Sequence, residues 1–185
     1  IAVRLALQQM ALPLAFGDLL AGVALALWAF TACAYAAKLA RRPGVVAEDL
    51  RVLPGRSGLA ALTMGGMAAA TLLAPYASDA ARVLLVASLA GHAVLALLLI
   101  RHLVGLPAEA RQVNPTLHLS LVGFIVAAPA ASALEWTGLA AGVFWATLPV
   151  ALGIWALSLV QFLRSEPPAP LRPLLAIHLA PAALV

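Results

Sequence analysis

The chain has 185 residues, of which 64% are hydrophobic and 10% are charged, and its mean hydropathy is +1.05. Because a soluble domain carries about 25% charged residues, this composition excludes a soluble protein and indicates an integral membrane protein. The net charge of +4 does not indicate nucleic-acid binding, since the basic residues lie between apolar runs, where they control topology.

Charged residues divide the chain into apolar runs, and a helical span needs about 20 predominantly apolar residues. Five runs are complete, and they cover residues 19–37, 57–78, 83–100, 112–134 and 136–163. A sixth run begins at Pro173 and has room for half a helix, so we expect the chain to be a fragment of a longer protein. Run length and the lack of period-two alternation exclude β-barrel strands. The predicted fold class is therefore all-α, a polytopic membrane protein of helical hairpins.

Basic residues are concentrated in alternate links between these runs. Nine lie in one set of links and two, Arg4 and Arg82, lie in the other set. The nine are Lys38, Arg41, Arg42, Arg51, Arg56, Arg101, Arg111, Arg164 and Arg172. By the positive-inside rule, the links with nine basic residues are predicted to be cytoplasmic.

Three of these arginines, Arg56, Arg111 and Arg172, each stand just before a span that enters from the cytoplasm. This repeat suggests helical hairpins along the chain, which is a common way to build a transporter or a channel. Each arginine also lies close to a helix N-terminus, where the backbone dipole is positive. We expect the three to form a cytoplasmic mouth that attracts anions; the alternative is that they only set topology.

The run 112–134 opens with polar residues, "NPTLHLS", although the rest of it is apolar. Asn114 and Pro115 are typical of a helix start at the cytoplasmic face. At 100° per residue, one narrow stripe of the helix collects small side chains, with Phe124 on its edge: Thr116, Ser120, Gly123, Ala127 and Ala131. Such a stripe fits close helix packing, the favoured interpretation, and it equally fits the lining of a narrow pore.

Two other runs differ in character. In 57–78, Gly58 and Gly65 share a face with Gly66 and Thr63 alongside, which indicates an interior element. The run 136–163 carries aromatic residues all around the helix and is predicted to face lipid: Trp136, Phe144, Trp145, Trp155 and Phe162.

Prolines recur inside the spans, at Pro129, Pro149 and Pro181. Each removes a helical hydrogen bond, so a carbonyl must find another donor or face a wet cavity. At any one site an ordinary kink is the simpler interpretation, but three prolines favour a cavity.

The histidine and acidic residues are the candidates for binding or chemical roles. His92 is predicted to be a hydrogen-bonded structural residue, whereas His118 and His178 are pore candidates. Two histidines on facing helices could also hold a haem, which leaves a membrane-embedded redox subunit as an alternative. All acidic residues lie at boundaries or in links, which argues against a carrier with a buried carboxylate. We predict no enzyme, no cofactor and no metal.

Three segments, "YAAKLARRPGVVAEDLRVLPGRSGLAALTM", "NPTLHLSLVGF" and "PPAPLRPLLAIHLAPAAL", resemble the TehA-type tellurite-resistance/dicarboxylate transporter family, which includes the slow anion channels of plant guard cells. The resemblance implies a ten-helix fold, arranged as five hairpins around a central pore, and a homotrimer in the bacterial inner membrane. On that scheme the chain, 1–185, is a single transmembrane domain fragment from the end of helix 1 to the middle of helix 7. Its inner helices would be 57–78, 112–134 and the one beginning at Pro173, and the gating aromatic residue would lie beyond Val185.

The predicted function is therefore passage of small anions through a pore lined by Pro-kinked inner helices. The partners are inorganic or dicarboxylate anions, among them tellurite, malate, chloride, nitrate and sulfite, together with the lipid bilayer. An ion-coupled dicarboxylate exporter is the alternative within transport. The pore-lining candidates are Gly58, Gly65, Gly66, Thr116, His118, Ser120, Gly123, Phe124, Pro129, His178 and Pro181.

Overall fold

The computed structural model describes residues 9–10, 14–105, 107, 114–164 and 175–179, and every regular element in these ranges is helical. The all-α prediction is confirmed. In chain order the elements are α2 (Ala15–Arg41), α3 (Val45–Arg51), α4 (Leu53–Leu73), α5 (Ser78–Val104), the π-helical turn η2 (His118–Val122), the 3-10 turn η3 (Gly123–Val126), α6 (Ala127–Ala133) and α7 (Thr137–Arg164). A further 3-10 turn covers residues 175–179.

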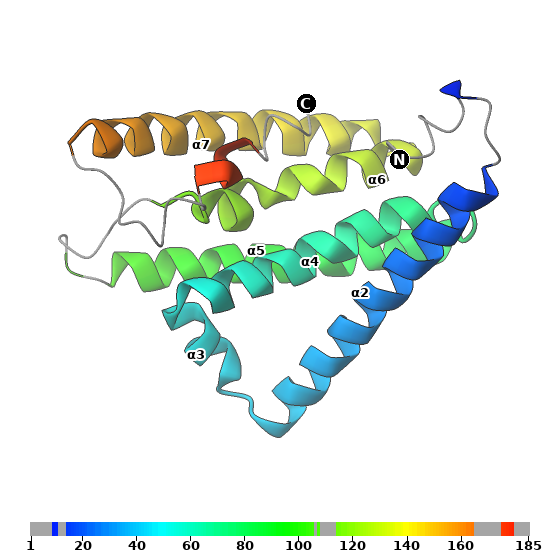
Figure 1. Ribbon diagram of the computed structural model, residues 1–185, viewed down its shortest axis with the longest axis horizontal. Coiled ribbons are helices and arrows are strands. Elements are labelled where there is room, and N and C mark those ends of the chain that lie inside the picture. The colour runs from blue at the N-terminus through cyan, green and yellow to red at the C-terminus, as the bar shows by residue number, and fades with distance from the viewer. Residues whose placement is uncertain (1–8, 11–13, 106, 108–113, 165–174, 180–185) are drawn as a thin grey trace.

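Two hairpins form the body of the molecule, one made of α4 and α5 and the other of α6 and α7 (Figure 1). Helix α4 contacts both α5 and α6, so it lies where the hairpins meet. The core there combines alanines with a few larger side chains, including Met67, Leu85, Ala127 and Ala130, all fully buried. Small residues let helix backbones approach closely, which explains the tight junction.

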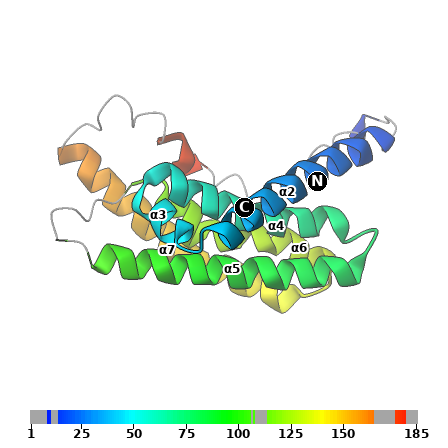
Figure 2. The ribbon, with the colours of Figure 1, turned by 90° about the horizontal axis from the view of Figure 1, so that it is seen from below.

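Helix α2 runs obliquely away from the hairpins, as both views show (Figures 1 and 2). It packs on α4 and exposes large apolar side chains such as Leu19, Leu27 and Phe30. Short α3 returns the chain to α4, and ion pairs Lys38–Asp49 at 3.3 Å and Arg42–Glu48 at 2.9 Å join it to the end of α2 and the link that follows.

Three helices in the described part of the chain are long and apolar enough to cross a membrane: Ala15–Arg41, Ser78–Val104 and Thr137–Leu163. They contain the predicted runs 19–37 and 83–100 and all but the first residue of 136–163. Helix α4 replaces the predicted run 57–78 but begins and ends earlier, at Leu53 and Leu73. It does not meet the same apolar criterion, because much of it is glycine, alanine and threonine.

The expectation of one regular α-helix over 112–134 is wrong, although residues 118–133 are helical throughout. The described part of this run is a π turn, a 3-10 turn and the seven-residue helix α6 in succession. Pro129 lies in the first turn of α6, where a backbone N–H has no helical partner in any case. It therefore does not interrupt a regular α-helix as predicted. Pro149 does lie inside an α-helix, α7, and Pro181 falls outside the described residues.

Candidate functional site

The segments predicted to be inner helices lie next to one another. Helix α4 contacts η2, η3 and α6 along their length. The turn 175–179 reaches the same region, since His178 Nδ1 lies 3.0 Å from Nε2 of His118 in η2. The candidate site is therefore built from α4, the broken segment 118–133 and the turn 175–179.

The polar start of this segment is helix-start chemistry, as predicted. The Asn114 side-chain oxygen accepts a hydrogen bond from the Thr116 backbone N–H at 3.1 Å, and the Thr116 hydroxyl donates to the same oxygen. The carbonyls of Asn114 and Pro115 then accept the first turn's bonds, from Leu117 and His118. Thr116 is buried and its hydroxyl is already engaged, so the cap accounts for both polar side chains.

The stripe of small residues is a packing face. Thr116 and Ser120 are 4% and 1% exposed, Ala127 and Ala131 are fully buried, and Gly123 is buried as well. The side chains left half-covered belong to other residues of the segment, among them Phe124, Ala128 and Pro129. Of the two interpretations of the stripe, the structure therefore favours close packing.

The side chains around Gly123 leave no room for a Cβ at this position. A Cβ at this position would lie 2.8 Å from His92 Cε1 and Nε2 and 2.9 Å from Met64 Sδ, so only glycine lets the start of the 3-10 turn approach α4 and α5 this closely. His92 is fully buried, its Nδ1 lies 2.7 Å from the Thr63 hydroxyl, and its ring meets the Phe124 ring edge-on at 4.6 Å. His92 is thus the hydrogen-bonded structural residue that the sequence predicted.

The glycines of α4 also meet side chains. A Cβ at Gly65 would lie 2.7 Å from Trp28 of α2, and one at Gly66 would collide with Ser88 of α5. The Trp28 indole N–H donates to the Leu62 carbonyl at 3.0 Å, which fixes the ring over these glycines. Gly58 differs: it is exposed and borders a surface pocket of ≈ 350 Å³ between α2, α3 and α4.

His118 and His178 form a hydrogen-bonded pair with their rings nearly perpendicular, at 84° and a centroid distance of 5.0 Å. His118 is 2% exposed and His178 is half-buried. Trp155 of α7 holds the pair from the other side: its indole N–H donates to the His178 carbonyl at 3.0 Å, and its ring lies 5.6 Å from that of His118. The prediction that the aromatic residues of α7 face lipid is therefore wrong for Trp155, although Trp145 and Phe162 are exposed.

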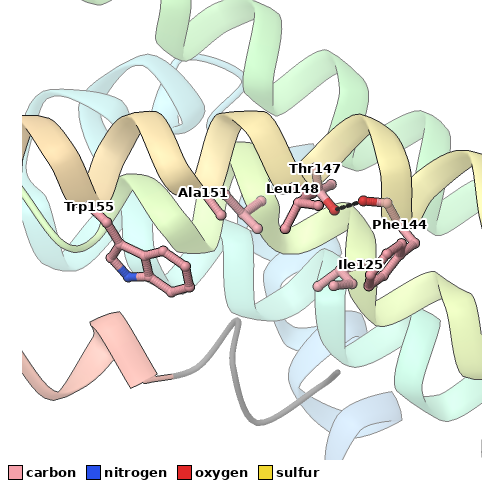
Figure 3. Close-up of a pocket in the computed structure, with 7 residues that line it drawn as sticks. Ile125, Phe144, Thr147, Leu148, Ala151 and Trp155 are labelled. Carbon is pink, nitrogen blue, oxygen red and sulfur yellow. Dashed lines mark hydrogen bonds between the residues drawn. The ribbon is translucent and has the colours of Figure 1, made fainter.

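A small apolar pocket lies between α7 and the π and 3-10 turns, bounded by Trp155 at one end and Phe144 at the other (Figure 3). Its volume is ≈ 20 Å³, enough for one water molecule but not for an anion with its hydration shell. The one hydroxyl on its wall, Thr147, donates to carbonyls of its own helix, at Val143 and Phe144. This pocket is a packing defect of the hairpin and offers an anion no ligand.

Arg56 is the one residue of the predicted cytoplasmic mouth within the described part of the chain, since Arg111 and Arg172 fall outside it. It lies in the first turn of α4, not before the helix. Its Nε donates to the Leu50 carbonyl of α3, and its Nη2 lies 3.2 Å from His102 Nε2 of α5. Arg56 therefore joins three elements at one end of the bundle, a role that spacing alone did not reveal.

The positions of the three histidines on which the haem alternative relied argue against a haem site. His118 and His178 touch each other, so no macrocycle fits between their rings, and His92 is enclosed by Thr63, Phe124 and Gly123. Among the described residues, no group of three or more His, Cys, Asp or Glu could hold a metal ion.

Sequence reasoning missed two tryptophans that shape this site, Trp28 and Trp155. A signal was available, because an indole N–H in the middle of a span must find an acceptor within the protein. Both donate to a backbone carbonyl, of Leu62 and His178 respectively.

A family model described as "SLAC1: Voltage-dependent anion channel" matches residues 1–185. The chain belongs to the voltage-dependent anion channel family. Neither the curated proteins nor the solved structures gave a significant match.

Membership of the voltage-dependent anion channel family makes the chain a multi-pass membrane protein that passes small anions, and it places it among non-enzymatic transporters. The resemblance drawn from the sequence, the all-helical fold class and the anion channel or transporter function are thereby confirmed.

Proposed function

We propose that this channel conducts small anions passively, along a path whose wall in this chain is made by α4, the broken segment 118–133 and the turn 175–179. The observation that carries the proposal is the difference in burial between neighbouring side chains of the broken segment. Its small residues are buried against neighbouring helices, whereas Phe124, Ala128 and Pro129 are left half-covered. These half-covered side chains are available to whatever completes the assembly.

The half-covered side chains are suited to line a path for weakly hydrated anions. Phe124, Ala128 and Pro129 are apolar, and no carboxylate lies on the segment. Such a wall binds an anion weakly, and conduction requires that an ion leave a site as readily as it enters. The pore-lining candidates retained in this proposal are the half-covered Phe124, Pro129 and His178, with Pro181 outside the described residues.

The finer expectations from the sequence belong to the same proposal. The chain would be part of a ten-helix protomer, from the end of helix 1 to the middle of helix 7, that assembles as a homotrimer in a bacterial inner membrane. Tellurite and C4-dicarboxylates such as malate would be cargo alongside smaller anions. The absence of acidic residues within η2, η3 and α6 supports passive conduction over coupling to a cation.

Flux in proteoliposomes tests the passive mechanism. The purified full-length protein is reconstituted, a potassium diffusion potential is set with valinomycin, and uptake of chloride, nitrate, malate and tellurite is followed without a sodium or proton gradient. We expect uptake that follows the imposed voltage. Uptake that appears only when a cation gradient is added would instead support an ion-coupled exporter.

A further inference from the structure

The histidine pair at the start of the broken segment has the geometry of a two-ligand metal site. His118 Nε2 and His178 Nδ1 lie 3.0 Å apart, on segments separated by 60 positions in sequence. Imidazole nitrogens bind Zn²⁺ at about 2.0–2.1 Å, so two of them on one tetrahedral ion lie roughly 3.3 Å apart. A movement of a few tenths of an ångström, together with a turn of both rings that points their lone pairs at one ion, converts this hydrogen bond into a shared coordination site.

We propose that His118 and His178 bind a divalent transition-metal ion of the Zn²⁺ or Ni²⁺ class. Imidazole is a preferred ligand of these ions, and neutral histidine is the form that coordinates them. The described residues offer no third His, Cys, Asp or Glu beside the pair, so water completes the coordination sphere. The site is therefore weaker than a structural zinc centre and responds to the free metal concentration.

The proton balance of binding is simple. In the neutral pair, one hydrogen lies between the two facing nitrogens, carried by one ring and accepted by the other. The metal ion takes the lone pairs of both nitrogens, and that hydrogen moves to the opposite nitrogen of its own ring. With both facing nitrogens coordinated, the two rings carry their hydrogens on His118 Nδ1 and His178 Nε2, and the buried His118 Nδ1, which has no hydrogen-bond partner among the described residues, keeps the affinity of the site low.

The surroundings hold the backbones of both histidines in place. The Trp155 indole donates to the His178 carbonyl at 3.0 Å, and the His118 backbone N–H donates to the Pro115 carbonyl in the turn capped by Asn114. The half-buried side of His178 supplies the route by which an ion enters.

Bound metal would link the start of the broken segment to the turn 175–179. The next step rests on the proposed function. A cross-link between two inner segments lowers anion flux, because it removes their freedom to move apart. Binding itself does not depend on that function.

Trp155 gives a direct readout of binding, since its ring lies 5.6 Å from that of His118 and Ni²⁺ quenches indole fluorescence at contact range. Ni²⁺ is titrated into the purified full-length protein after removal of any affinity tag. We expect saturable quenching that is lost in W155F. H118Q and H178Q should each weaken binding by about tenfold or more, since losing a ligand costs at least as much as losing a ligand's support. H102Q, which changes a histidine bonded to Arg56, should bind as the unmodified protein does.

A thermal shift keeps the test independent of the optical signal. Ni²⁺ should raise the Tm of the unmodified protein and of W155F, and should not raise that of H118Q or H178Q. The absence of saturable quenching and of a Tm shift, or equal binding by H118Q, H178Q and the unmodified protein, would overturn the proposal. If the metal binds but Zn²⁺ does not change anion flux, the metal site is supported and the proposed link between the site and conduction is contradicted.

Discussion

At the scale of single residues, the positions that matter most are those where a side chain would not fit. Gly123 lets the 3-10 turn approach His92 and Met64, and Gly66 lets α4 approach Ser88. The sequence could predict that these glycines lie at contacts, because small residues at helical spacing are typical of membrane helix packing. It could not identify the partners, because Met64 and His92 lie on α4 and α5, far from Gly123 in sequence.

The first prediction concerns Gly123→Ala. The new methyl group would lie within 2.9 Å of His92 and Met64 atoms, so the 3-10 turn must move away from α4 and α5. We expect a loss of about 1–3 kcal/mol in the free energy of unfolding, measured by thermal denaturation in detergent. Gly142→Ala is the matched control, since a Cβ there meets nothing within 4 Å. Equal stability of the two variants would contradict the packing of this turn.

At the scale of elements, the long helices α2, α5 and α7 could be predicted from hydropathy alone, because charges bound each of them. The broken segment 118–133 could not. Its run of apolar residues is long enough for one helix, and no residue pattern in it marks where the π and 3-10 turns lie. The π turn depends on long-range contacts with His92 and with the pair His118–His178, which periodicity along one segment does not reveal.

The turn between α6 and α7 supplies the second prediction. Glu135 has a φ of 62°, and the bonds from Trp136 N–H to the Ala131 carbonyl and from Glu135 N–H to the Ser132 carbonyl form a Schellman motif. Glycine is the residue that adopts this conformation without strain. Glu135→Gly should therefore raise the free energy of unfolding by about 0.5–1 kcal/mol.

The measurement is again the thermal denaturation midpoint in detergent. Glu135→Ala removes the same carboxylate but keeps a Cβ in the left-handed region, so it should give no stabilisation. A gain in Tm for the alanine variant as large as that for glycine would assign the effect to charge and contradict the backbone explanation.

At the scale of the whole molecule, the distribution of charge predicts the orientation and divides the chain into spans, and membership of the anion channel family agrees with a multi-pass membrane protein. The predicted interior runs do lie side by side in the structure. What the sequence could not supply was which face of each segment is covered, because that depends on three helices packing at once. For this reason the sequence left two interpretations of the stripe of small residues, packing and pore lining. The burial of these residues favours packing.

The cytoplasmic mouth is tested by charge removal. Neutralising Arg56, Arg111 and Arg172 together, each to Gln, should lower anion flux at low ionic strength, because the positive potential at the pathway entrance falls. The flux of reconstituted protein is compared with that of a control in which Arg41, Arg42 and Arg51 are changed to Gln. The control removes the same charge from the same predicted side. Equal flux in the two triple variants would leave these arginines only a topological and, for Arg56, a packing role.

The most direct test of the inner wall compares two adjacent alanines. Ala127 is fully buried, whereas Ala128 is half-covered on the proposed path. Each is changed to cysteine in the full-length protein carrying Cys33→Ser, and a membrane-impermeant thiol reagent is applied to proteoliposomes during anion flux. The account predicts that Ala128→Cys is modified and loses flux while Ala127→Cys is protected. Protection of Ala128→Cys, or modification of Ala127→Cys instead, would contradict it.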